Sequence, residues 1–218
     1  MNKGNPGFRL VILPLASWGL ALLLAGCSVS LLPEKEPQRQ FTLPYHYEAG
    51  QSASSAADAL PALRINRPRA SGLPGGKRII VEKDPNERAA YGSVRWVTAA
   101  PELLQDHIVR ALRADHRLGR VVSDASGSAS EVTLSSSLQD FHEDRTGDQR
   151  RVRLYLQAQL VENGSRRPLA TRDFEVSVPV DEDGIEASVA AFGRAADRLS
   201  GELADWLSDS LEDYSPED

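Results

Sequence analysis

Residues 151–160 read RVRLYLQAQL and alternate polar and apolar side chains without a break. The apolar positions are Val152, Leu154, Leu156, Ala158 and Leu160. A period of two residues is typical of a β-strand that buries one face and exposes the other. The stretch therefore predicts a half-buried strand whose wet face carries arginine, tyrosine and glutamine.

The same alternation occurs on both sides of this strand. It covers Val132, Leu134, Ser136 and Leu138 before the strand, and Phe174, Val176 and Val178 after it. Asn163-Gly164 lies between the last two runs and is a strong turn signal. Residues 131–179 are thus predicted to form an antiparallel meander of three long strands with one solvated face.

Other segments complete the predicted domain. Residues 63–65, 78–81 and 93–97 have the composition of strands. A helix is predicted between Pro101 and Gly119. A longer helix is predicted from a capping box at Asp183 and Glu186 to Trp206. Trp206 lies on the apolar stripe of this second helix and is expected in the core. The predicted fold class is α+β, a largely antiparallel sheet with two amphipathic helices packed on one face, preceded by a lipoprotein signal and a tether.

The N-terminus indicates export and lipidation. Lys3 and Arg9 precede an apolar run from Leu10 to Leu24, which is too short to span a bilayer comfortably. The run ends in Leu24-Ala25-Gly26-Cys27, which contains the chain's single cysteine and resembles the bacterial lipoprotein box. We therefore expect residues 1–26 to be a signal peptide and Cys27 to be acylated, which would anchor the mature chain to a membrane. An uncleaved anchor helix is the alternative, but it leaves the Leu-Ala-Gly-Cys order unexplained.

The mature chain is expected to have three parts. Residues 27–61 form a lipidated N-terminus and tether, residues 62–211 form one domain, and residues 212–218 form an acidic tail. Within the tether, residues 41–45 either form a short edge strand docked on the domain or belong to a wholly flexible segment. Both interpretations stay open.

Charge and motifs argue against several functions. The chain has 25 basic and 31 acidic residues, and removing a signal that holds two of the basic ones leaves a net charge of −8, so nucleic acid is not an expected partner. The four histidines have no metal-site spacing, and residues 72–77, GLPGGK, have the wrong glycine spacing for a nucleotide phosphate loop and are predicted to form a turn. We expect no cofactor, no metal and no enzyme activity.

A cluster in residues 91–96, YGSVRW, is the candidate partner-binding site. Tyrosine, arginine and tryptophan dominate the energies of protein interfaces, so Tyr91, Arg95 and Trp96 could face a partner. The alternative places Trp96 in the core and Arg95 on the wet side of the sheet. We favour the core for Trp96 and leave Arg95 open.

The chain resembles the ABC-type transport auxiliary lipoproteins of the PqiC type. The resemblance covers nearly all of the mature chain, and it rests on the lipoprotein box followed in order by Phe41-Thr42-Leu43-Pro44, Arg78-Ile79-Ile80-Val81, Tyr91, Arg95-Trp96, Pro101-Glu102-Leu103-Leu104-Gln105, Asp140-Phe141, Ala191-Phe192 and Trp206. One departure is Phe41, where the family more often has tyrosine.

The resemblance implies an outer-membrane lipoprotein that faces the periplasm and works with an MCE-domain protein in intermembrane lipid transport. It also implies that members can form homo-oligomeric rings. We therefore expect an adaptor that docks the MCE protein to the outer membrane. One alternative is a lipid-binding carrier, which would need an apolar pocket of several hundred Å³. Another is a structural envelope lipoprotein with no transport role.

Overall fold

The computed structural model describes residues 38–48, 60–212 and 214, all within the compact unit Pro37–Asp218. The predicted signal peptide, Cys27 and most of the predicted acidic tail lie outside the described residues. Within the described ranges, no helix is both long and apolar enough to cross a bilayer.

The predicted meander is confirmed and forms one side of the sheet, with its last strand at the edge. It consists of β6 (Val132–Asp144), β7 (Arg151–Glu162) and β8 (Pro168–Pro179), paired antiparallel in chain order. Val152, Leu154 and Leu156 are fully buried, while Arg153 and Gln157 at alternate positions are exposed. The period-two pattern thus assigned the buried face correctly.

The other edge of β6 is shared by two strands. β2 (Leu63–Ile65) pairs parallel to the beginning of β6, and β3 (Arg78–Asp84) pairs parallel to its end. β4 (Glu87–Trp96) is antiparallel to β3, and β1 (Arg39–Phe41) and β5 (Val121–Ser123) are short parallel strands at the periphery. The sheet is mixed, with its long pairings antiparallel and its short ones parallel.

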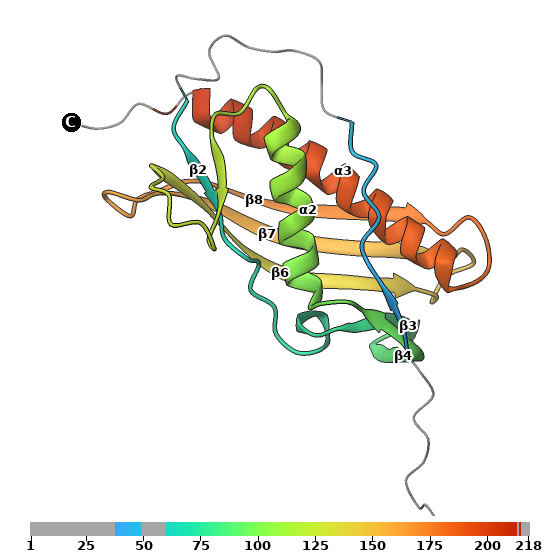
Figure 1. The fold of residues 1–218 in the computed structure, drawn as a ribbon. Coiled ribbons are helices and arrows are strands. Elements are labelled where there is room, and N and C mark those ends of the chain that lie inside the picture. Colours follow the sequence, from blue (N-terminus) through green and yellow to red (C-terminus); the bar gives the residue numbers. More distant parts are fainter. Residues whose placement is uncertain (1–37, 49–59, 213, 215–218) are drawn as a thin grey trace, which may run out of the picture. The chain divides into compact units, whose positions relative to one another are not determined.

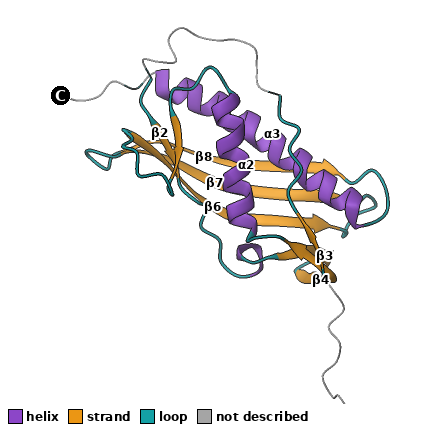
Figure 2. Cartoon of the chain, viewed as in Figure 1, coloured by secondary structure: helices purple, strands orange, loops and turns teal. Residues whose placement is uncertain are grey.

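Two helices cover one face of this sheet, as predicted (Figures 1 and 2). They are α2 (Ala100–Ala114) and α3 (Ile185–Glu212), and their apolar faces pack on each other and on the sheet. α2 ends before Gly119, because the Asp115 carboxylate binds the backbone and guanidinium of Arg117 and turns the chain. α3 begins at Ile185, and Asp183, the expected cap, pairs with Arg150 instead.

Aromatic side chains fill the space between the layers. Phe141 from β6 and Phe192 from α3 have ring centroids 4.7 Å apart, and Trp96 from β4 packs edge-on against Phe192 at 5.3 Å. Trp206 packs against Phe174 at 5.6 Å and is 8% exposed, so its predicted core position is confirmed. Such packed aromatic contacts fix the helices over the sheet.

The segment 41–48, which we call the N-terminal strap, docks on the helices as well as on the sheet (Figure 1). An edge strand does form beside β4, but it is β1 (Arg39–Phe41) and overlaps the predicted strand 41–45 only at Phe41. Residues 42–45 dock on the domain without strand pairing, so the predicted bounds were wrong. Further along, the Tyr45 ring stacks on Arg110 and on His107, and the His46 N–H donates to Asp197. The strap therefore crosses the junction of α2 and α3.

Two glycines of α3 allow a test of strap docking. A Cβ at Gly193 would lie 2.8 Å from the Pro44 carbonyl oxygen, whereas a Cβ at Gly201 would meet Tyr47 at an ordinary 3.7 Å. Both sites should gain up to about 1 kcal/mol of helix propensity from alanine. We predict that Gly201→Ala raises the free energy of unfolding, whereas Gly193→Ala forfeits this gain and displaces the strap.

Urea unfolding and amide hydrogen exchange check this prediction. Exchange should become faster across residues 41–48 in Gly193→Ala only. Equal stability and equal exchange in both variants would show that Pro44 does not constrain position 193.

Candidate functional site

A hollow of about 680 Å³ lies beside the start of β3 and the second half of β4. We call it the basic hollow. It is lined by Gln38, Gly72–Leu73, Gly76–Arg78, Ala90–Gly92 and Val94–Arg95. Residues 73–75 form a short 3₁₀ turn at its rim, so the turn predicted for GLPGGK is confirmed. Two of the three predicted partner-binding residues, Tyr91 and Arg95, line this hollow.

The walls of the basic hollow carry three cations, Lys77, Arg78 and Arg95, and no carboxylate. Arg78 and Arg95 are directly opposite each other in the antiparallel pair of β3 and β4, so their side chains leave the sheet on the same face. Among the described residues neither guanidinium forms an ion pair, and the buried Arg95 Nε has no hydrogen-bond partner. The Lys77 ammonium donates to the Val97 carbonyl at 3.0 Å.

Trp96 does not belong to this surface. Its side chain is 0% exposed and contacts Phe141 and Phe192 in the core. Successive residues of a strand point to opposite faces, so burial of Trp96 directs Arg95 away from the core. The prediction that Trp96 lies in the core is confirmed. The alternative prediction, that Trp96 faces a partner, is wrong because its side chain is fully buried.

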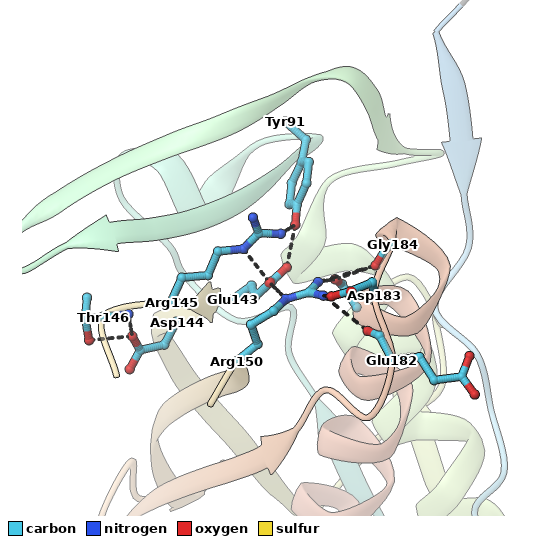
Figure 3. Close-up of polar contacts among 10 residues, drawn as sticks. Tyr91, Glu143, Asp144, Arg145, Thr146, Arg150, Glu182, Asp183 and Gly184 are labelled. Carbon is cyan, nitrogen blue, oxygen red and sulfur yellow. Dashed lines mark hydrogen bonds and ion pairs between the residues drawn. The ribbon is translucent and has the colours of Figure 1, made fainter. Parts of the chain in front are cut away.

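The Tyr91 hydroxyl is fixed by a hydrogen bond to a buried carboxylate, that of Glu143 (Figure 3). The Tyr91 hydroxyl donates to Glu143 Oε2 at 2.6 Å, and Arg145 donates to the same hydroxyl. Arg145 Nε and Arg150 Nε each donate to Glu143 Oε1 at 2.7 Å. Glu143 is 0% exposed, and two guanidinium groups surround its single negative charge.

The same cluster reaches α3 through Arg150. This guanidinium donates to the Glu182 carbonyl at 3.1 Å and to the Asp183 carboxylate at 3.2 Å (Figure 3). It also donates to the Ser188 hydroxyl at 2.8 Å. One buried carboxylate thus connects β4, the end of β6 and the first turn of α3. The position of Tyr91 in the basic hollow depends on this connection.

The environment shifts two pKa values in the cluster. Burial by itself raises the pKa of Glu143, but hydrogen bonds from Arg150, Arg145, Tyr91 and Ser188 outweigh burial and lower that pKa to about 2. Burial and the bond to Glu143 raise the pKa of the Tyr91 hydroxyl. At neutral pH, Glu143 is therefore ionised and Tyr91 is a neutral hydrogen-bond donor.

Apolar side chains are exposed next to the three cations. Among the described residues, the exposed large hydrophobic side chains are Leu73 at 38% and Val97 at 37%. Leu73 lines the basic hollow, and Val97 follows β4 directly and binds Lys77 through its carbonyl. This end of the sheet therefore combines tyrosine, arginine and exposed aliphatic groups, a composition found at protein interfaces.

A family model for ABC-type transport auxiliary lipoprotein components matches residues 41–204, about three quarters of the sequence. The chain belongs to this family. The match includes the strap, every residue of the basic hollow except Gln38, and most of α3. A comparison with curated proteins gives no significant match.

Two solved structures share the fold of this auxiliary lipoprotein. A crystal structure of a Xanthomonas campestris protein, XCC0632, has a TM-score of 0.71 and 22% sequence identity, covering 79% of this chain and 96% of that protein. A crystal structure of an uncharacterised protein has a TM-score of 0.62 and 16% identity, covering 79% and 99% respectively. At these identities the likeness concerns the fold alone.

Sequence reasoning missed the Glu143 cluster because of an irregularity in β6. The pairing of β6 with β7 shifts between Leu138 and Asp140, and this bulge changes which residues face the helices. Phe141 and Glu143 consequently continue the buried series begun by Val132 and Leu134. The nearby Arg145 and Arg150 were the available sequence signal, since a buried carboxylate needs cationic partners.

Two of the four histidines lie beside carboxylates. His107 Nε2 hydrogen bonds to Asp197 at 2.9 Å. His142 Nε2 lies 2.9 Å from Glu82, but neither ring nitrogen of His142 has hydrogen-bond geometry to a described residue. Among the residues that the structure describes, no three metal-ligating side chains converge on one point.

The Glu143 cluster predicts a pH-dependent contribution to stability. Because the pKa falls from an ordinary 4.5 to about 2 on folding, the charged form contributes roughly 3 kcal/mol above pH 4.5, and this is lost as pH falls through 2. We predict that Glu143→Gln lowers the free energy of unfolding by about that amount at pH 7, and that the two proteins converge as the pH falls from 4.5 towards 2.

Urea unfolding at several pH values measures this difference. Glu175→Gln is the matched control, since Glu175 forms an exposed pair with Arg153 and should contribute less than about 1 kcal/mol. A pH-independent difference between wild type and Glu143→Gln would contradict the assigned ionisation.

Proposed function

We propose that this protein is an outer-membrane adaptor that docks an MCE-domain periplasmic protein of a lipid transport system. In this proposal Cys27 carries the acyl chains that anchor the chain, and residues 28–37 form part of the tether to the folded unit. Membership of the auxiliary lipoprotein family supports a transport role and a lipid anchor. The outer membrane and the MCE partner come from the sequence resemblance.

The surface around the basic hollow is the proposed docking site. The observation that carries this assignment is the grouping of Tyr91, Arg95 and the exposed Leu73 at one end of the sheet. Tyr91 is already fixed by the Glu143 cluster, so little side-chain freedom would be lost when a partner binds it. An adaptor needs such a preorganised surface, and it does not need an enclosed apolar pocket.

The carrier alternative has less support from the packing. A carrier needs an apolar pocket between its layers, but there Trp96, Phe141 and Phe192 are fully buried and in mutual contact. Three hollows bounded by described residues, of about 680, 640 and 280 Å³, all have charged side chains in their walls. We therefore rank the adaptor above the carrier.

Copurification from native membranes tests the adaptor. We predict that full-length protein extracted in a mild detergent retains an MCE-domain protein, and that Cys27→Ala, which removes the lipid attachment, reduces its recovery. Arg95→Glu reverses a charge at the proposed docking surface and should reduce recovery without loss of acylation. Mass spectrometry identifies the retained chains and reports the acyl modification.

Arg69→Glu is the charge-matched control, because Arg69 is exposed and lies outside the basic hollow. If Arg95→Glu and Arg69→Glu recover equal amounts of the MCE-domain protein, the docking surface does not include the basic hollow. Recovery of stoichiometric phospholipid and no MCE-domain protein would favour the carrier.

A further inference from the structure

We infer that the basic hollow binds a phosphate group, either free or as the headgroup phosphate of a lipid. The inference deepens the proposed function, on which it rests only for the source of a lipid phosphate. It starts from the arrangement of charge around Arg78 and Arg95 and from the space that these residues line.

The two opposed arginines are an electrostatic cost to the folded protein. Like charges directly opposite in an antiparallel pair are destabilising, and Lys77 adds a third positive charge beside them. Some other arginines form ion pairs, as Arg150 does with Glu143, and others do not, so what distinguishes Arg78 and Arg95 is that they lie directly opposite each other. Arg78 and Arg95 lack such partners among the described residues, so an external anion would offset their repulsion.

The nearest buried carboxylate does not provide this compensation. Glu143 hydrogen bonds to Tyr91 at the wall of the basic hollow, but Arg145 and Arg150 already balance its charge. The guanidinium of Arg145 also lies over the Tyr91 ring, 5.5 Å from its centroid. Because Asp183 also pairs with Arg150, the charges of the Glu143 cluster balance, and the cluster supplies no spare negative charge to the basic hollow.

The donors in the hollow suit a phosphate better than a single carboxylate. A phosphate has several anionic oxygens around one phosphorus atom. A guanidinium group can donate two parallel hydrogen bonds to two of these oxygens, and a lysine ammonium adds a localised positive charge. The Arg95 Nε is buried and has no hydrogen-bond partner among the described residues, so no protein group in the described ranges uses this donor. Lys77, Arg78 and Arg95 can thus bind one phosphate group together.

The size and rim of the hollow leave room for more than the phosphate. About 680 Å³ is within the range of small-molecule sites, and Leu73, Ala90 and Val94 provide apolar wall beside the cations. The turn at 73–75 bounds the hollow without the spacing of a nucleotide phosphate loop. A glycerophosphate headgroup matches this combination of cationic and apolar wall.

The test uses full-length acylated protein in a neutral detergent at constant ionic strength. Isothermal titration calorimetry with inorganic phosphate should give saturable binding to the wild type. Arg78→Gln and Arg95→Gln should each weaken binding by about tenfold or more, as expected for loss of a charge-assisted hydrogen bond. Arg69→Gln removes the same charge outside the basic hollow and should change the affinity by less than about twofold.

A thermal readout keeps the test independent of any folding defect. Without phosphate, Arg78→Gln and Arg95→Gln should melt at or above the wild-type temperature, because each removes one of two opposed charges. Added phosphate should raise the melting temperature of the wild type and of Arg69→Gln, but not of the two hollow variants.

Water-soluble dihexanoyl phosphatidic acid, with dihexanoylglycerol as the phosphate-free control, distinguishes the sources. Tighter binding of the phosphatidic acid than of inorganic phosphate assigns a lipid headgroup, and equal binding assigns free phosphate. No saturable binding of either, or binding unaffected by Arg78→Gln and Arg95→Gln, overturns the inference. The inference is also overturned if the basic hollow binds an acidic peptide and added phosphate does not compete with that peptide.

Partner capture separates this inference from the proposed function. If the MCE-domain protein copurifies but phosphate does not bind, only the phosphate site is overturned. If phosphate binds and no MCE-domain protein is recovered, the phosphate site stands and the adaptor is overturned.

Discussion

A fully buried carboxylate imposes the main constraint on this molecule. Glu143 lies on the helix-facing side of the sheet, where an unpaired charge would be strongly unfavourable, and Arg145, Arg150 and Tyr91 meet its hydrogen-bonding needs. These partners come from different parts of the chain, so satisfying one charge fixes β4, the end of β6 and the start of α3 together. The constraint places Tyr91 at the wall of the basic hollow.

The packing of the two layers depends on the same bulge that buries Glu143. After the shift near Leu138, Phe141 points to the helices and contacts Phe192 and Trp96. Burial of Trp96 in turn directs Arg95 to the other side of β4. The aromatic core therefore determines which way Arg95 points, while the register of β3 and β4 places Arg78 opposite it. An interior packed in this way favours a protein that binds at its surface over one that encloses a lipid.

The proposed docking surface and the proposed phosphate site overlap in the basic hollow, and both include Arg95. Leu73 is exposed beside the cations, and Arg78 and Arg95 form no ion pair with a described residue. In a transport auxiliary lipoprotein, a phosphate held there would stand where the partner meets this chain. The overall charge of the protein is negative, so this local excess of cations is a specific feature of β3 and β4.

Local pattern was enough to predict much of the fold. Alternation along residues 151–160 assigned the faces of β7, and the helical stripe through Trp206 placed that side chain in the core, because both depend on short-range periodicity alone. The lipidation of Cys27 also follows from local sequence and stays a prediction. Pairing partners of the short strands 39–41, 63–65 and 121–123 could not be predicted, since their parallel neighbours are distant in the chain.

By itself the sequence determined the α+β class, the three-stranded meander and the two covering helices. The tertiary structure alone decided which charges meet. Glu143 became buried through a bulge that periodicity does not reveal, and Arg78 became the neighbour of Arg95 through the register of β3 and β4. Periodicity determines which side of an element is apolar, but the approach of side chains from separate elements depends on register and packing, which the whole chain sets.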